Sequence, residues 1–164
     1  MSNITYHSLS DYVGGKCISK TFELDHVTFE VHQEEISEWL TSITKERKDG
    51  EIREEWIVCD YEDIPHEYVG EYHIDESFFH LMSAIDNSHY DAEVFHAGVS
   101  LGLSIENIED NYFGYFSDET ELGEMCADGL EIPDNIQPYF DYEAYGRACS
   151  YDFMESDGHY FFNH

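Results

Sequence analysis

Carboxylates are the residues of this 164-residue chain with the greatest capacity for chemistry, because 37 Asp and Glu stand against seven Lys and Arg. Paired carboxylates are common machinery for general acid–base catalysis, but the pairs here are so numerous that none stands out. The chain has no glycine-rich phosphate loop, no GxSxG elbow and no lone cysteine with a spaced histidine signature. The sequence therefore predicts no catalytic residues and a protein that is not an enzyme.

Ten histidines beside so many carboxylates also suggest a metal site. Histidines recur every seven residues at 66, 73 and 80 and again at 89 and 96, but Gly70 interrupts the first series and Asn87 and Ser88 precede the second. No HExxH motif occurs, and the stretch from Asp86 to Glu93 lacks the central glycine of a calcium loop. We therefore expect surface or core histidines, with no metal and no cofactor.

The cysteines and the apolar stretches of the sequence indicate the cellular location of the protein. Cys17, Cys59, Cys126 and Cys149 form no CxxC pair, so free thiols are the simplest interpretation. The first ten residues lack the positive region and apolar core of a signal peptide. No stretch approaches the ~20 apolar residues of a membrane span. We therefore expect a cytoplasmic protein that does not bind membranes.

The charge is large and unevenly distributed. The formal net charge is −30, yet six of the seven basic residues lie between Lys16 and Arg53, and the segment from Glu54 to Gly146 has 24 acidic residues and no Lys or Arg. High charge is typical of disordered chains, but those are poor in aromatic residues. Here 26 Tyr, Phe and Trp predict a folded protein that tolerates self-repulsion. Such a protein would bind a basic partner and no nucleic acid.

DNA offers a comparison for this charge. Duplex DNA carries one negative charge per ~1.7 Å of axis, so the 27 acidic residues and one Arg between Glu54 and His164 correspond to roughly 44 Å of duplex. Carboxylates lie about 5–6 Å apart at i, i+4 on a helix and about 6.5 Å apart at i, i+2 on a strand. Both separations approach the ~7 Å between successive phosphates. The pattern favours a protein that imitates the charge of DNA and occupies a DNA-binding groove.

We expect carboxylates on predicted helices to form the partner-binding surface. Glu106 and Asp110 have helical spacing, as do Glu121 and Glu124. The full set of partner-binding candidates is Asp75, Glu76, Glu106, Glu109, Asp110, Asp118, Glu119, Glu121 and Glu124. An ordinary solvated position is the alternative for each single residue, but it does not explain why basic residues are missing from the whole segment.

An α+β fold must position these carboxylates. Apolar residues at 36, 39, 40 and 43 predict a helix with Glu34 and Glu35 in its first turn. Strands are predicted before it at 5–9 and 17–31, and a return strand after it at 54–59. Further helices are predicted to begin at Asp75 or Ser77 and at Ser117, and to cover about 90–101, 104–113 and 138–149. Asp157-Gly158 predicts a terminal β-hairpin.

These elements group into three small units. We expect an N-terminal α+β unit over residues 1–65, an antiparallel sheet with a helix. A central helical unit over 66–107 and a C-terminal mixed α/β unit over 108–164 would follow. No repeat or low-complexity linker separates them, so the units would pack end to end.

Several segments, in order, resemble the ArdA antirestriction proteins, acidic DNA mimics encoded on mobile elements and phages. They are LSDYVGGK at 9–16, EEWIVCDYE at 54–62, IENIEDNYFGYFSD at 105–118, IPDNIQPYFDYEAYGR at 132–147 and the closing YFF at 160–162. The resemblance implies an elongated molecule of three small α/β units that forms a homodimer shaped like bent DNA. It also implies a target in the host cytoplasm: the DNA groove of type I restriction–modification enzymes, formed by the methyltransferase core with its specificity subunit.

Other functions remain open at this point. A mimic could instead inhibit another DNA-binding defence nuclease or a repressor, and a metal-binding acidic protein is a less favoured alternative. Adaptation to high salt predicts evenly spread acidity, and the basic cluster between Lys16 and Arg53 speaks against it. A pull-down with candidate DNA-binding proteins would separate these possibilities.

Overall fold

The structure, a computed structural model, describes residues 1–163 and confirms the predicted α+β class. Within these residues it has seven α-helices and two antiparallel sheets of three strands each. The chain divides into two compact units, the first from Met1 to Asp86 and the second beginning at Asn87. We describe each unit by itself; the predicted division into three units, at residues 65/66 and 107/108, stays a prediction. No helix among the described residues combines the length and apolar character needed to cross a membrane.

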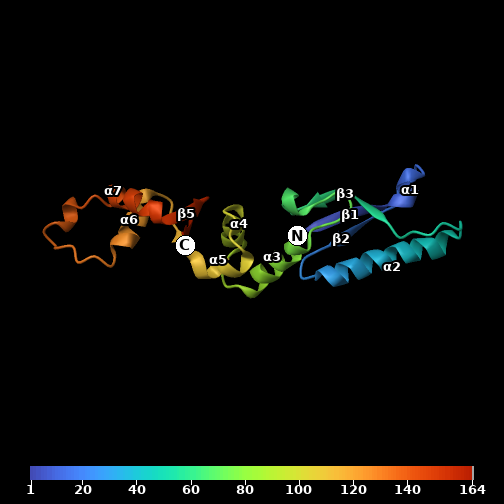
Figure 1. Cartoon of the computed structure of the whole chain (residues 1–164), viewed down its shortest axis with the longest axis horizontal. Helices are drawn as coiled ribbons and strands as arrows, with labels where there is room; N and C mark the ends of the chain where they lie inside the picture. The colour runs from blue at the N-terminus through green and yellow to red at the C-terminus, as the bar shows by residue number, and fades with distance from the viewer. Residues whose placement is uncertain (164) are drawn as a thin grey trace. The chain divides into compact units, whose positions relative to one another are not determined.

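The first unit is built on a sheet with strand order β2-β1-β3 (Figure 1), formed by β1 (Asn3–Ser8), β2 (Ser19–Glu23) and β3 (Trp56–Glu62). The short helix α1 (Leu9–Val13) connects β1 to β2 and ends in a turn in which Gly15 has a φ of +75°. Alternate residues of β1 are buried, and Tyr6 and Phe22 lie on the buried face. One face of the sheet is therefore available to pack against a helix.

Helix α2 (Phe29–Arg47) packs on that face through Trp39 and His32, which contact the Phe22 ring. The predicted apolar positions at 36, 39, 40 and 43 are all buried, as expected. The predicted boundaries were wrong: β2 ends at Glu23, and the helix begins well before Glu34. The Thr28 hydroxyl caps the helix by accepting from the Val31 N–H at 3.3 Å, so the helix begins one turn earlier than its apolar periodicity indicates.

Helix α3 (Glu76–Asn87) completes the first unit after the 3₁₀ turn η1 (His66–Tyr68). Its Phe79 ring packs against Phe29 and His32 of α2, and Phe78 packs against Tyr68. The core of this unit is therefore continuous from the sheet through α2 to α3.

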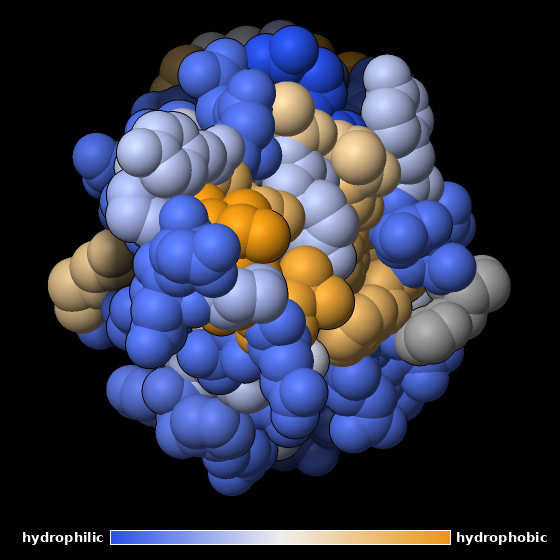
Figure 2. Space-filling view, turned by 90° about the vertical axis from the view of Figure 1, so that its left-hand side faces the viewer, coloured by the Kyte–Doolittle hydropathy of each residue, from blue (hydrophilic) through white to orange (hydrophobic). Residues whose placement is uncertain are grey.

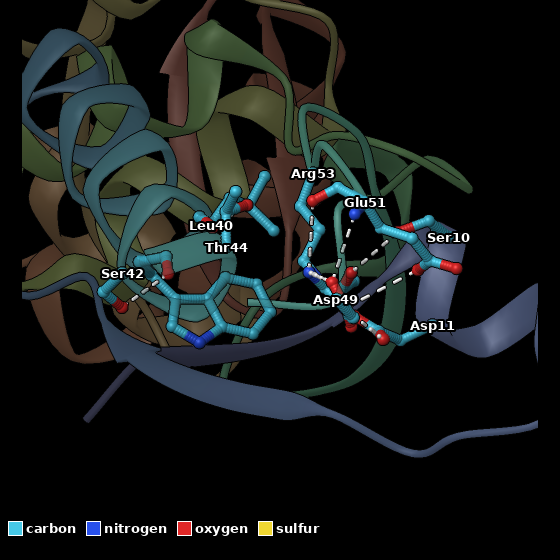
Figure 3. A network of polar contacts seen from close by, with 10 residues as sticks. Ser10, Asp11, Leu40, Ser42, Thr44, Asp49, Glu51 and Arg53 are labelled. Atoms are coloured by element: carbon cyan, nitrogen blue, oxygen red, sulfur yellow. Dashed lines mark hydrogen bonds and ion pairs between the residues drawn. The ribbon is translucent and has the colours of Figure 1, made fainter. Parts of the chain in front are cut away.

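Arg53 is enclosed by carboxylates in the same unit (Figure 3). Its Nε donates to Asp11 Oδ2 at 2.6 Å and its Nη2 donates to Asp49 Oδ2 at 2.8 Å, with no part of the Arg53 or Asp11 side chains exposed. The guanidinium lowers the pKa of Asp11 to about 2. Arg53 therefore joins α1 to the segment after α2 and contributes no positive charge to the surface.

The second unit holds the sheet β4-β6-β5, formed by β4 (Tyr112–Tyr115), β5 (Phe153–Ser156) and β6 (His159–Phe162). Asp157 and Gly158 have φ values of +51° and +81° and turn the chain between β5 and β6, which confirms the predicted hairpin. The predicted helix to Phe113 was too long, because α5 (Ile105–Asn111) ends where β4 pairs with β6.

The other helices of this unit are α4 (Ala92–Ser100), α6 (Glu119–Ala127) and α7 (Tyr142–Cys149), with 3₁₀ turns η2 (Gln137–Tyr139) and η3 (Ser150–Asp152). The last predicted helix was also too long, since α7 begins only after η2 and is capped by Asp141. Helices α6 and α7 touch through their backbones. A Cβ on Gly123 would lie 1.9 Å from the Tyr142 carbonyl oxygen, and one on Gly146 would lie 1.8 Å from that of Glu119.

An apolar patch lies at the end of the second unit that carries α6 and α7. Figure 2 faces this end and shows apolar side chains gathered at its centre within a hydrophilic surround. The large apolar residues exposed between positions 125 and 139 are Met125, Leu130, Ile136 and Tyr139. Exposed apolar groups that gather in this way are typical of an interaction surface.

Candidate partner-binding surface

The acidic side chains lie almost entirely on the surface of the described residues. Of the 37 Asp and Glu, only Asp11 is buried, and Asp25 and Glu119 are partly buried. The remaining carboxylates are exposed. The fold therefore exposes nearly all of the acidic side chains to solvent, and only Asp11 is buried in an ion pair.

The two units differ in how much basic charge they carry. The first has 20 Asp and Glu against six Lys and Arg, and the second has 17 against a single basic residue, Arg147. Arg147 is already engaged: its Nε donates to Glu119 Oε2 and its Nη2 to Glu143 Oε1, both at 2.9 Å. The second unit therefore has an acidic surface whose one permanent cation is neutralised by two of its own carboxylates.

Three of the predicted candidates lie together on the short helix α5 of the second unit. Glu106, Glu109 and Asp110 are all exposed, and their spacings of three and four residues put Cβ atoms about 5–6 Å apart. The Ser88 hydroxyl donates to Glu109 and ties this carboxylate to the segment before α4. No Lys or Arg belongs to this helix, so the row is a local concentration of negative charge.

Four further candidates lie at the start and along α6. Asp118, not the predicted Ser117, is the cap: its Oδ1 accepts from the Glu121 N–H at 2.9 Å, while Glu121 Oε2 accepts from the Ser117 N–H at 2.8 Å. These two carboxylates therefore stabilise the helix N-terminus as well as adding charge. Glu119 pairs with Arg147, and Glu124 is exposed on the same helix.

Asp75 and Glu76 belong to the first unit, at the start of α3. Asp75 accepts hydrogen bonds from the backbone N–H and hydroxyl of Ser77, which lower the pKa of its carboxyl. Glu76 lies 3.6 Å from His80 Nε2, one turn along the helix. Both are exposed, but the Asp75 hydrogen bonds are those of a helix cap. The nine candidates thus fall into groups on α3, α5 and α6.

The sequence reasoning missed two features of this surface. It counted Arg53 among the basic residues, although the structure removes it from the surface, and it did not pair Arg147 with Glu143. The i, i+4 spacing of Glu143 and Arg147 is a signal that could have revealed that pair. Among residues 1–163, no group of three or more His, Cys, Asp or Glu side chains is placed to hold a metal ion.

Comparisons with known proteins bear on this arrangement. A family model described as antirestriction protein (ArdA) matches residues 7–162. A search of curated proteins finds no match. The family match includes both units and the α3, α5 and α6 carboxylates, and it extends over nearly the whole chain. The protein belongs to the ArdA family of antirestriction proteins.

Proposed function

We propose that this protein is a DNA mimic that inhibits type I restriction–modification enzymes by occupying their DNA-binding groove in the host cytoplasm. Membership of the ArdA family supports the antirestriction role. The observation that carries the mimicry is the surface of the second unit, with 17 acidic residues and one Arg that is already paired. Its exposed carboxylates can meet the Lys and Arg side chains that normally contact DNA phosphates.

The mechanism is competitive occupancy. Carboxylates replace phosphates in the groove, and electrostatic attraction makes association fast and sensitive to salt. Because phosphate contacts position a protein on DNA whereas base edges specify the sequence, a mimic without bases inhibits enzymes of different recognition sequence alike. Its partners in this proposal are the methyltransferase core and the specificity subunit.

We also propose that the inhibitor is a homodimer that uses the apolar patch of the second unit. Met125 on α6, Leu130 and Ile136 after it, and Tyr139 in η2 all expose large apolar side chains, and their burial against a second copy would remove apolar area from water. Sedimentation analysis at micromolar concentration tests this directly. An Ile136→Glu variant should shift the protein toward the monomer, whereas a monomeric wild-type protein would contradict the proposal.

DNA competition tests the function itself. Purified type I methyltransferase is mixed with labelled DNA containing its recognition site, and the protein is titrated in at several salt concentrations. We expect displacement of DNA to the same extent for two enzymes with different recognition sequences. Displacement that follows the recognition sequence would contradict groove occupancy. Failure to displace DNA from any type I enzyme, with displacement from another nuclease or a repressor, would redirect the proposal to that target.

A further inference from the structure

A pocket in the second unit is lined mainly by aromatic rings. It has a volume of about 320 Å³ and lies between the start of α4 and the strands β4 and β6. Its lining residues are His89, Tyr90, Asp91, Glu93, Val94, Tyr112, Tyr115 and His159, and the His89 ring lies 4.1 Å from that of Tyr90. None of these residues is among the nine predicted partner-binding candidates, so the pocket is a separate feature of the surface.

A β-bulge brings two of the tyrosines to the same side of the sheet. In a regular strand Tyr112 and Tyr115, three residues apart, would point to opposite faces. The pairing of β4 with β6 slips by one residue after Tyr112, so Tyr112 pairs with Phe161 and Tyr115 pairs with His159. Because residues 159 and 161 of β6 share a face, both tyrosines lie on that face.

The rings form walls at steep angles to one another. Tyr90 and Tyr112 meet edge to face, with centroids 5.2 Å apart and an interplanar angle of 76°. The Tyr115 ring lies 5.2 Å from that of His159, and the Tyr112 hydroxyl lies 3.1 Å from His159 Nδ1. Tyr115 is 58% exposed, so the pocket is open to solvent. Aromatic walls of this kind attract cations through their electron-rich faces.

The carboxylates around the pocket also favour a cationic ligand. Asp91 occupies the N-cap position of α4 and Glu93 lies in its first turn, and both are exposed. The helix N-terminus contributes about half a positive charge, which two full carboxylates outweigh. Nucleobases could also stack on tyrosines, but their phosphates would be repelled by these carboxylates and by the acidic unit around them.

We propose that this tyrosine pocket binds an arginine side chain of the partner protein. A planar guanidinium can stack on tyrosine while its N–H groups reach a carboxylate in a fork, which a lysine ammonium cannot match. This inference rests on the proposed function for the identity of the partner, whose DNA groove supplies the arginines. The pocket adds a discrete contact to an interface that otherwise depends on distributed charge.

NMR titration of the full-length protein with L-argininamide tests the pocket. L-Citrullinamide is the matched probe, because its side chain has nearly the same shape and no charge. At constant ionic strength we expect saturable shifts of the backbone amides at Tyr90, Asp91 and Tyr115 with argininamide, and binding at least about five-fold weaker with citrullinamide.

Two variants localise the effect. Asp91→Asn with Glu93→Gln removes the charge, while asparagine is as favourable as aspartate at an N-cap position. We expect about five-fold weaker argininamide binding. Glu131→Gln with Asp134→Asn removes the same charge from an exposed segment that does not line the pocket, and it should leave argininamide binding within two-fold. Tyr115→Leu should weaken argininamide binding about five-fold. Its control is Tyr151→Leu, because Tyr151 is 81% exposed and does not line the pocket.

The outcomes separate this inference from the proposed function. Equal shifts with argininamide and citrullinamide, or equal losses in the two charge variants, would refute the pocket. If wild-type protein still displaces DNA from the methyltransferase in that case, the proposed function stands without it. If argininamide binds as expected but DNA is not displaced, the pocket serves an arginine of another partner.

Discussion

Burial determines the charge of one side chain in the core of the first unit. His32 on α2 is fully buried, its Nε2 lies 2.9 Å from the Tyr6 hydroxyl, and its Nδ1 has no hydrogen-bond partner within residues 1–163. Desolvation lowers the pKa of His32 to about 4, against an ordinary value of 6.5. The folded protein therefore keeps this imidazole neutral over the range in which most histidines become protonated.

We predict that this buried histidine makes the first unit labile to acid. Because the folded-state pKa lies below that of the unfolded chain, the unfolded chain takes up the proton more readily. The His32 contribution to stability is complete above about pH 6.5 and is lost as the pH falls through about 4, with a total of about 3 kcal/mol. Urea unfolding at several pH values between 7 and 4 measures the slope.

The double variant Tyr6→Phe with His32→Leu is the matched comparison, because it removes both partners of the buried hydrogen bond together. Its stability should change less between pH 6.5 and 4 than that of the wild type. Parallel slopes for the two proteins would show that His32 is not the titrating group.

For single residues, the sequence could identify which side chains are charged but not which of them are buried or paired. The excess of carboxylates, the missing basic residues after Arg53 and the nine candidates all come from residue types alone. That Arg53 is enclosed by Asp11 and Asp49 depends on contacts 42 and four residues apart, of which only the second is local. The tyrosine pocket was likewise invisible, because it needs a β-bulge and a pairing of β4 with β6.

Helices α6 and α7 of the second unit are in backbone contact. Gly123 and Gly146 sit at this contact, where an added methyl group would overlap a carbonyl oxygen of the facing helix. Neither backbone can move away without separating the helices. We predict that Gly123→Ala and Gly146→Ala each lower the free energy of unfolding by about 3 kcal/mol, the upper part of the range for overpacking.

Gly129→Ala is the control for this prediction, because a Cβ there meets no atom within 4 Å. It should leave stability within about 0.5 kcal/mol of the wild type. Urea unfolding measured on all three variants gives the comparison. If Gly123→Ala were as stable as Gly129→Ala, the helices would not be in backbone contact.

Two cysteines allow a second test of the contact between α6 and α7. Cys126 and Cys149 each lie three residues after one of these glycines, and the Cys149 thiol interacts with that of Cys126. Burial first, and then Cys149, raise the pKa of Cys126 to about 11, which slows its reaction at neutral pH. With the disulfide reagent diamide as oxidant, we predict that the two thiols lose their protons and two electrons and join as a Cys126–Cys149 disulfide.

Mass spectrometry of the digested, non-reduced protein detects this link. The formation rate should rise with pH up to about 11, because only the thiolate reacts. The urea-unfolded protein provides the control for random oxidation, because there the helix contact is lost. If the folded protein formed the Cys126–Cys149 link no more readily than the unfolded protein, the helix contact would be contradicted.

Elements with strong local signals were predictable, and their ends were not. The apolar spacing of α2 and the Asp157-Gly158 turn follow from local chemistry, and both were confirmed. The start of α2 depends on Thr28, and the end of α5 depends on the pairing of β4 with β6. A tertiary contact sets such a boundary against the local helical preference, so sequence periodicity alone misplaces it.

At the scale of the whole molecule, partner binding should depend on where charge is removed. We predict that Glu106→Gln, Glu109→Gln and Asp110→Asn each weaken inhibition about two-fold or less, and that the triple variant weakens it by at least about five-fold. The control triple on α2, Glu34→Gln, Glu35→Gln and Glu38→Gln, removes the same charge from the unit that carries all the exposed lysines. DNA competition measures both, and equal losses would contradict a surface centred on the second unit.

Salt should act on stability and inhibition in opposite directions. A net charge of −30 opposes folding through repulsion among the protein's own carboxylates, and salt relieves it as the screening length falls from ~30 Å at 0.01 M to ~10 Å at 0.1 M. We therefore predict that Tm rises between these concentrations, by about 2–4 °C for each kcal/mol of repulsion relieved.

The same screening removes attraction to a basic groove, so the association rate with the methyltransferase should fall about ten-fold or more between 0.02 and 0.3 M. Calorimetry and stopped-flow mixing in identical buffers measure the two quantities. A rise in Tm without any loss of association rate would mean that the carboxylates repel one another but do not contact the partner's basic residues, and it would remove the electrostatic basis of the proposed mimicry.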